Sequence, residues 1–170
     1  MNAGDVTAHP GNPGGEVALR PIRDEDLDGM FAQMRDPESV WMAAFTSADP
    51  DDRALFDARM ARIRAAPDIT HRSITYDGRL VGSIACFVAD GDTEITYWID
   101  RAFWGRGIAR AALRQFLELV TVRPLHARAA SDNRGSLAVL RGAGFVATGT
   151  ALGYAEARKT EIEETLLRLD

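Results

Sequence analysis

The spacing of hydrophobic and polar positions changes several times along this chain and divides it into strands and helices. The first strand is expected at 17–22, where Pro21 removes one backbone donor and therefore suits a strand end or a sheet edge. A helix follows from an acidic start at 24–26, and Pro37 is expected to end it. Apolar residues recur at helical spacing and form one face of this helix, namely Leu27, Met30, Phe31 and Met34.

A second helix is expected after a loop that contains Trp41 and Phe45. Asp49 followed by Pro50 is a typical helix start, because proline is tolerated in the first turn. The apolar face of this helix comprises Leu55, Phe56, Met60 and Ile63. Two helices therefore precede most of the sheet.

Three antiparallel strands occupy the middle of the chain. The segments 72–76 and 80–87 flank Asp77-Gly78, which is a strong hairpin signal. A second turn at 90–92 leads into 93–100, where apolar and polar residues alternate as in a strand with two unlike faces. These strands form a meander.

After residue 106, the spacing of apolar residues changes to that of a helix. The segment 107–121 has no proline and no internal glycine, and its inward face comprises Ile108, Ala112, Phe116 and Leu119. A short strand at 125–130, a short helix at 133–141 and final strands at 145–148 and 164–169 complete the chain. The order β-α-α-β-β-β-α-β-α-β-β predicts an α+β fold with a mixed central sheet flanked by helices.

Length and composition limit what the chain can be. Its 170 residues, 46% hydrophobic and 26% charged, suit one globular domain over 16–170, and the Pro- and Gly-rich segment 1–15 is expected to be a flexible tail. The net charge of −5 argues against a nucleic-acid partner. No apolar run long enough for a membrane span and no signal-like start are present, so we expect a cytoplasmic protein. The lone Cys86 cannot form an internal disulfide, and no spacing of His, Cys and Asp indicates a metal site.

The segment 95–110 carries the most informative chemistry. A strand ends, a tight turn contains Gly105 and Gly107, and a long helix begins. Unpaired N–H groups at a helix start bind anions, and glycine lets the backbone approach a bulky diphosphate, to which Arg106 and Arg110 can add charge-assisted contacts. Taken by itself, the turn fits two interpretations equally well: its glycines bind a phosphate group, or they serve only the backbone conformation of the turn. The turn does not match the dinucleotide-binding motif, because Arg110 occupies the position of its third glycine. It does not match a kinase-type phosphate loop either, because no Gly-Lys-Ser/Thr is present.

At these residues the sequence resembles the GCN5-related N-acetyltransferase (GNAT) superfamily. Its motif [QR]-x-x-G-x-[GA] aligns with Trp104-Gly105-Arg106-Gly107-Ile108-Ala109, with Trp104 in place of Gln or Arg. With an aromatic residue at this position, the motif resembles that of one branch of the family, the ribosomal-protein alanine and serine N-acetyltransferases. Asn133-Arg134-Gly135-Ser136 followed by Gly144-Phe145 is similar to the family's N-x-x-S…GF segment. The resemblance extends over about 17–170.

The resemblance implies a binding mode for acetyl-CoA as co-substrate. The strand ending near Ile99 would splay from a parallel neighbour beginning near Leu125, and the pantetheine arm would lie in this V. The backbone amide near Ile99 would stabilise the oxyanion, and Asn133 would meet the pantetheine or adenosine end. The turn and helix start would bind the diphosphate, and the residues implied there are Trp104, Gly105, Arg106, Gly107, Ile108, Ala109 and Arg110.

The implied reaction is acetyl transfer to a primary amine, either a protein N-terminus or a small molecule. Many family members place a proton-donating tyrosine seven residues after the asparagine, but here that residue is Leu140. Either Ser136 protonates the departing thiolate or the thiolate leaves unassisted, and Ser136 is equally plausible as a hydroxyl that satisfies the first helical turn. A non-catalytic acyl-CoA-binding or regulatory module on the same fold is the alternative function that Leu140 suggests.

Several carboxylates and aromatic residues are candidates for the rest of the site. Glu94 is the first candidate for the general base, and a solvated strand-end carboxylate is its alternative interpretation. The other candidates are Glu161, Glu163, His71 and His126 as bases and Tyr154, Trp41, Phe45 and Trp98 as borders of the acceptor site. An exposed strand edge or the region of Trp41 could support a homodimer.

Overall fold

The computed structural model describes residues 14–170, so the predicted tail at 1–15 lies almost entirely outside the described residues. The strands are β1 (Val17–Pro21), β2 (Thr70–Tyr76), β3 (Arg79–Ala89), β4 (Asp92–Ile99), β5 (Leu125–Ala130), β6 (Val146–Ala155) and β7 (Thr160–Leu169). The helices are α1 (Leu27–Gln33), α2 (Pro37–Ala43), α3 (Arg53–Ala65), α4 (Ile108–Leu119) and α5 (Arg134–Gly142), with short 3-10 turns η1 (Asp24–Asp26) and η2 (Arg101–Phe103). Over residues 14–170, no helix is both long and apolar enough to cross a membrane.

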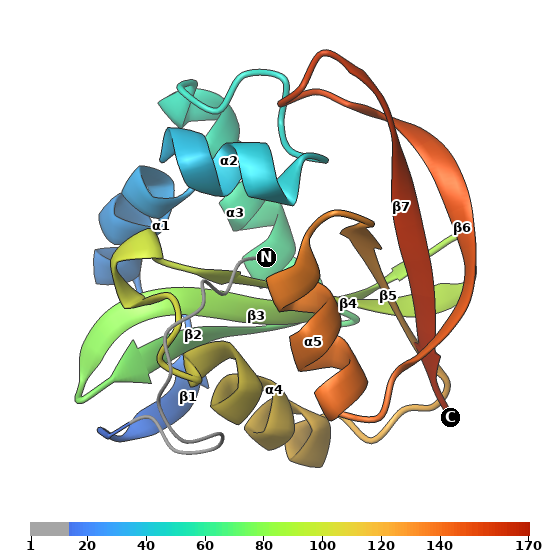
Figure 1. Ribbon diagram of the computed structural model, residues 1–170. Coiled ribbons are helices and arrows are strands. Elements are labelled where there is room, and N and C mark those ends of the chain that lie inside the picture. Colours follow the sequence, from blue (N-terminus) through green and yellow to red (C-terminus); the bar gives the residue numbers. More distant parts are fainter. Residues whose placement is uncertain (1–13) are drawn as a thin grey trace.

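The strands form one seven-stranded sheet in the order β1-β2-β3-β4-β5-β7-β6 (Figure 1). Neighbouring strands are antiparallel except β4 and β5, which run parallel. The predicted α+β fold with a mixed central sheet is therefore confirmed. The single parallel pair lies between the meander and the C-terminal strands, so it divides the sheet into two antiparallel halves.

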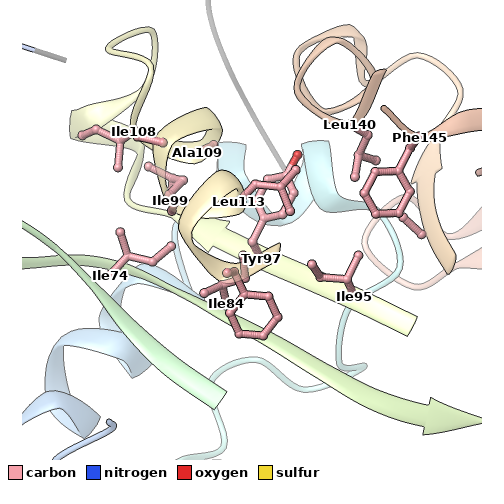
Figure 2. Close-up of a cluster of buried hydrophobic side chains, with 14 of the residues drawn as sticks. Ile74, Ile84, Ile95, Tyr97, Ile99, Ile108, Ala109, Leu113, Leu140 and Phe145 are labelled. Atoms are coloured by element: carbon pink, nitrogen blue, oxygen red, sulfur yellow. The ribbon is translucent and has the colours of Figure 1, made fainter. Parts of the chain in front are cut away.

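Helices cover both faces of the sheet, and the larger core lies under α4 and α5. Figure 2 shows Ile95, Tyr97 and Ile99 of β4 pointing into this core, where α4 contributes Ile108 and Leu113. The alternate β4 side chains, at positions 94, 96 and 98, point to the face that α1 and α3 cover. The alternation of apolar and polar residues in β4 was thus predicted correctly: one face of the strand packs in the core, and the other faces α1 and α3.

One helix was not predicted. Pro37 begins α2 instead of ending α1, and the residues around Trp41 are helical and not a loop. Asp36 caps the new helix, because its carboxylate accepts a hydrogen bond from the Ser39 N–H at 2.9 Å. Proline fits the first helical position, where its missing N–H would have had no partner. The short preceding helix α1 had already ended at Gln33.

The predicted helical faces and final strands need smaller corrections. Leu55 and Leu119 are exposed, whereas Ile108, Ala112 and Phe116 are buried as expected. The last two strands form one long hairpin that starts at Val146 and is longer than predicted. Most β6 side chains are exposed, so no apolar alternation marks this strand in the sequence.

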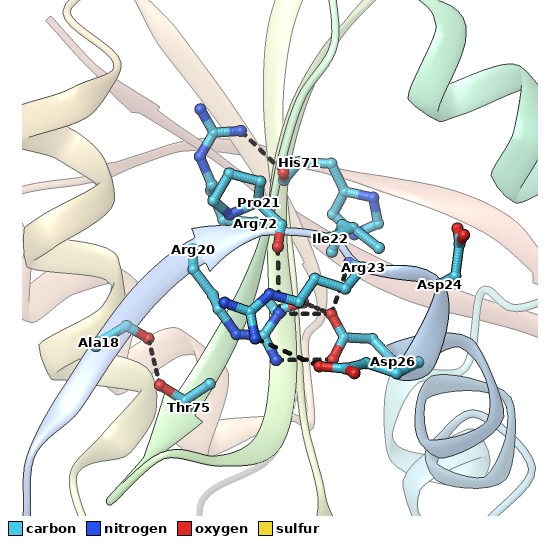
Figure 3. Close-up of polar contacts among 12 residues, drawn as sticks. Ala18, Arg20, Pro21, Ile22, Arg23, Asp24, Asp26, His71, Arg72 and Thr75 are labelled. Atoms are coloured by element: carbon cyan, nitrogen blue, oxygen red, sulfur yellow. Dashed lines mark hydrogen bonds and ion pairs between the residues drawn. The ribbon is translucent and has the colours of Figure 1, made fainter.

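A buried carboxylate ties the first strand to its neighbours. Asp26, which is 2% exposed, accepts two hydrogen bonds from the Arg20 guanidinium at 2.6 and 2.8 Å (Figure 3). It accepts a third from the Ser73 hydroxyl at 2.8 Å. The Arg23 N–H adds a fourth at 2.8 Å. Burial is the largest effect and opposes ionisation, but the hydrogen bonds together outweigh it and lower the pKa of Asp26 to about 2. The ionised carboxylate thus joins β1, β2 and the start of α1.

Gly82 on β3 allows the end of β4 to approach closely. It lies opposite Ile99, and a Cβ at this position would overlap the backbone carbonyl oxygen of Trp98. We expect Gly82→Ala to lower the free energy of unfolding by about 1–3 kcal/mol, as overpacking does, because a backbone atom has to move. Urea denaturation measures this. Gly149→Ala is the matched control, since its Cβ would meet no atom within 4 Å, and a change of more than about 0.5 kcal/mol there would contradict the interpretation.

Candidate functional site

The parallel strands β4 and β5 separate almost at once. They pair at a single position, Glu94 opposite His126, and then diverge toward Ile99 and Ala130. On the other side of β4, the Asp100 N–H donates to the Val81 carbonyl of β3 at 2.7 Å. Because backbone groups alternate in direction along an antiparallel strand, the N–H of Ile99 points away from β3 and into the gap. The open end of the V therefore has a backbone donor directed into it.

Trp104 fastens the following turn to the end of β4. Its indole Nε1–H donates to the Ile99 carbonyl oxygen at 2.9 Å, and its side chain is partly buried. Asp100 also supports the turn, because its carboxylate accepts a hydrogen bond from the Ala102 N–H at 3.0 Å. Trp104 consequently positions the turn relative to Ile99 through its own donor.

The turn and the start of α4 present backbone N–H groups to solvent. Gly105 and Gly107 have φ of 72° and 75°, values that glycine adopts without strain, and both are exposed. The first backbone hydrogen bond within α4 runs from the Ala111 N–H to the Gly107 carbonyl oxygen at 3.1 Å. The N–H groups of Ile108, Ala109 and Arg110 therefore have no partner within the helix. The side chains of Ile108 and Ala109 are buried, so these two residues can contact an anion only through the backbone.

Arginine side chains surround the same turn. The guanidinium carbons of Arg106 and Arg79 lie 5.0 and 5.3 Å from the centroid of the Phe103 ring. Arg110 and Arg114 line a cleft of about 420 Å³ between α4 and the end of α5. Sequence reasoning named Arg106 and Arg110 but missed the other two. Arg114 follows Arg110 by one helical turn, which was a usable signal, whereas Arg79 comes from a distant hairpin.

The start of α5 packs against β4 across the V. Asn133 caps this helix by accepting from the Ser136 N–H at 3.2 Å, and its Nδ2 donates to the Met42 carbonyl oxygen at 3.3 Å. The Ser136 hydroxyl is 3.1 Å from the Tyr97 hydroxyl, and both side chains are buried. Burial raises the pKa of Tyr97 well above its usual value, and the hydrogen bond with Ser136 only partly offsets this. Tyr97 is thus a protonated hydroxyl that the sequence analysis did not name.

The position of the usual donor tyrosine belongs to the core. Leu140 is fully buried and contributes to the cluster in Figure 2. The Asn133 amide is also buried and bonded within the protein, so its side chain acts here on α5 and α2. Contacts of Asn133 and Ser136 with a substrate stay predictions.

Glu94 lies at the closed end of the V. Its carboxylate is 2.9 Å from Nη2 of Arg128, whose Nη1 is 3.4 Å from Glu164. This cluster joins β4, β5 and β7 where β4 and β5 still pair. Ile99 comes five positions after Glu94, which corresponds to roughly 16 Å along an extended strand. The base role of Glu94 stays a prediction, and its ion pair supports a structural role as well.

Two adjoining cavities occupy the opposite face of the sheet, under α1 and α3. Their volumes are about 540 and 420 Å³, and together we call them the acceptor cavity, after the role proposed for them below. Five residues line both: Met34, Phe45, Arg59, Thr96 and Trp98. Phe45 and Trp98 therefore border a cavity, and their contact with an acceptor stays a prediction. Trp41 lies elsewhere, under the Arg158 guanidinium, and Tyr154 is exposed on β6 and lines neither part.

His71 lines the same cavity. It lies on β2 in one cross-strand row with Ala85 and Thr96. Burial, reinforced by the charge of Arg72, lowers the pKa of His71 to about 4, so the imidazole is neutral at pH 7. Sequence reasoning had named His71 only as a minor candidate base.

Known proteins resemble this chain in both sequence pattern and fold. The family model described as an acetyltransferase (GNAT) domain matches residues 16–146. RimJ from Mycobacterium smegmatis, solved with CoA-disulfide, superposes with a TM-score of 0.77 at 24% identity, over 92% of this chain and 83% of that protein. No curated protein sequence matches the chain.

Two further solved structures have the same fold. Ribosomal-protein-alanine N-acetyltransferase from Brucella melitensis gives a TM-score of 0.75 at 18% identity, over 89% of this chain and 98% of that one. Spermidine N-acetyltransferase from Vibrio cholerae, in complex with CoA and spermine, gives 0.75 at 13% identity, over 90% and 94%. At these identities the superpositions establish a shared fold.

Proposed function

The chain belongs to the GNAT acetyltransferase family, and we propose that it transfers the acetyl group of acetyl-CoA to a primary amine. One observation carries the proposal: the splayed strands β4 and β5 and the glycine turn before α4 meet at Ile99. A ligand with an extended arm and a diphosphate fits this combination, because one end can pair with strand backbone while the other binds helix N–H groups. Solved relatives in complex with CoA support the same assignment.

The binding residues follow from this arrangement. Backbone N–H groups from Gly105 to Arg110 bind the diphosphate, and the Ile99 N–H faces the acetyl carbonyl. Trp104 contributes by fixing the turn to Ile99. The cleft beside Arg110 and Arg114 adds positive charge next to the diphosphate site and can accept the remaining phosphate of CoA.

The reaction is direct attack by a neutral amine. A nitrogen–carbon bond forms, the carbon–sulfur bond breaks, the thiolate gains a proton and the amine loses one. Ser136 is the proposed proton donor to the thiolate, and its contact with protonated Tyr97 provides a route for replacing that proton. The amine arrives from the acceptor cavity, whose wall includes Thr96 and Trp98 of the strand that ends at Ile99.

Two groups are candidates to accept the amine proton. Glu94 is on the same strand as Ile99, but its ion pair with Arg128 and its distance require intervening water. The neutral His71 imidazole faces the acceptor cavity and is the second candidate. Activity of the Glu94→Gln and His71→Gln variants separates them.

The acceptor is either a protein N-terminus or a small-molecule amine. Relatives of the same fold are named for both kinds, since one is a ribosomal-protein-alanine and another a spermidine N-acetyltransferase. For the proposed homodimer, β6 is the candidate contact, because it is an edge strand with exposed Val146, Leu152 and Tyr154.

A thiol-release assay with acetyl-CoA and a panel of amines tests the proposal. We expect CoA release that depends on an amine, with small amines and peptides beginning with Ala or Ser as the two acceptor classes. Acetyl-CoA binding without turnover on any acceptor would favour the alternative, a non-catalytic acyl-CoA-binding module suggested by Leu140 in the usual donor position. Absence of acetyl-CoA binding would contradict both.

A further inference from the structure

The acceptor cavity contains polar groups that no other part of the described chain satisfies. Among residues 14–170, two buried side-chain polar atoms have no hydrogen-bond partner: Thr46 Oγ1 and His71 Nδ1. Both residues line the acceptor cavity, Thr46 in the outer part and His71 in the inner part. Buried polar groups in folded proteins nearly always bond to protein, ordered water or a ligand, so a polar ligand in this cavity has two partners to bond.

A cation lines both parts of the cavity. Arg59 of α3 lines both parts of the cavity and is half-buried, yet its guanidinium makes no hydrogen bond or ion pair with another residue of 14–170. Arg53 and Arg64 of the same helix are paired, Arg53 with Asp28 and Asp57 and Arg64 with Asp24. Arg62 also lines the inner part but is exposed, whereas Arg59 is half-buried and lines both parts. Guanidinium groups bind carboxylate or phosphate in a bidentate geometry, so Arg59 is suited to an anionic group of the acceptor.

The remaining charges of the cavity suit an acceptor that carries both signs. Asp49 and Asp52 line the outer part, and Arg62 and Asp68 line the inner part. Asp52 already caps α3 by accepting a hydrogen bond from the Leu55 N–H at 2.9 Å. Carboxylates near the outer part favour an approaching ammonium group, whereas Arg59 favours an anion. A polyamine would place only positive charge beside Arg59.

The rest of the wall is apolar. Side chains from α1 and the residue that follows it, from α3 and from β3 complete the wall, namely Met30, Met34, Met60, Ile63 and Phe87. Methionine-rich walls adapt to different apolar groups. Thr96 and Trp98 place the cavity beside the end of β4, where the amine has to react.

We infer that the acceptor is an amine that also bears a carboxylate or similar anionic group and an apolar side chain, with the anion bound by Arg59 and the Thr46 hydroxyl. This inference rests on the proposed acetyltransferase function and names its substrate class. The Arg59 guanidinium and the Thr46 hydroxyl donate to the anion, the apolar side chain packs against the methionines, and the amine faces Thr96.

A matched pair of acceptors tests the inference. Phenylalanine and phenylalaninamide have the same side chain and amine but differ in the carboxylate, and kcat/KM is measured for each with wild-type protein, Arg59→Gln and Arg59→Lys. We expect Arg59→Gln to lower kcat/KM for phenylalanine by about 10- to 100-fold, mainly through KM, with less than threefold change for the amide. Comparing the ratio of the two substrates between variants removes their different intrinsic reactivity. Arg59→Lys should recover part of the loss.

Two controls keep the outcomes distinct. Arg64→Gln removes a cation that lies on the same helix but outside the cavity. This variant should leave kcat/KM unchanged for both substrates. Binding of N-acetylphenylalanine and N-acetylphenylalaninamide to the CoA-loaded protein gives a readout without turnover. Equal effects of Arg59→Gln on both compounds, or no binding of either, would overturn the inference. If the wild-type protein does not bind CoA, the proposed function itself is overturned.

Discussion

Gly107→Val is expected to weaken CoA binding by about 100-fold while the domain stays folded. Gly107 has φ of 75° immediately before the first residue of α4, and its exposed backbone faces the proposed diphosphate site. A β-branched side chain would place two methyl groups where the diphosphate approaches and would resist the left-handed backbone conformation. Losing one or two charge-assisted hydrogen bonds, each worth about 1.5–3 kcal/mol, accounts for an effect of this size.

Isothermal titration with CoA measures this effect, and thermal unfolding reports on the fold. Gly91→Val is the matched control, because Gly91 has φ of 87° in the β3–β4 turn and a Cβ there would meet no atom within 4 Å. It imposes similar backbone strain far from the site, so CoA affinity should stay within threefold of the wild type. A folded Gly107→Val protein with unchanged CoA affinity would contradict the placement of the diphosphate.

Ser136→Ala is expected to lower kcat by about 10- to 100-fold with little change in CoA affinity. Its hydroxyl is the proposed donor to the departing thiolate, and general acid catalysis commonly contributes factors of about 10²–10⁴. We place the effect at the lower end, because a thiolate is a good leaving group even without protonation. Tyr97→Phe should show a smaller loss in the same direction, since Tyr97 acts through its contact with Ser136.

Thr75→Val is the control for loss of a buried hydroxyl. Thr75 lies on β2, and its hydroxyl donates only to the Ala18 carbonyl oxygen at 3.4 Å, away from the V. Its activity should equal that of the wild type. Unchanged kcat in Ser136→Ala, or a loss explained by CoA affinity alone, would show that the thiolate leaves unassisted and that the Ser136 hydroxyl serves the start of α5.

The sequence determined the features that depend on neighbouring residues. Helix starts, hairpin turns and strand alternation arise from contacts within a few positions, so the β2–β3 hairpin, the two faces of β4 and the glycine turn before α4 were all predicted correctly. The α2 error has the same local origin. Pro37 can end one helix or begin the next, and only the capping bond from Ser39 to Asp36 decides between them.

Only the tertiary structure decided how distant residues combine. Glu94 and Arg128 pair across 34 positions, and Tyr97 meets Ser136 across 39, so neither contact leaves a periodic signal in the sequence. The acceptor cavity joins Thr46 of the α2–α3 loop, Arg59 of α3 and His71 of β2, and the lack of hydrogen-bond partners for their side chains appears only when the surrounding structure is known. Local backbone preferences therefore placed the glycine turn proposed to bind CoA, whereas burial and long-range packing decided which side chains line the cavity proposed for the acceptor.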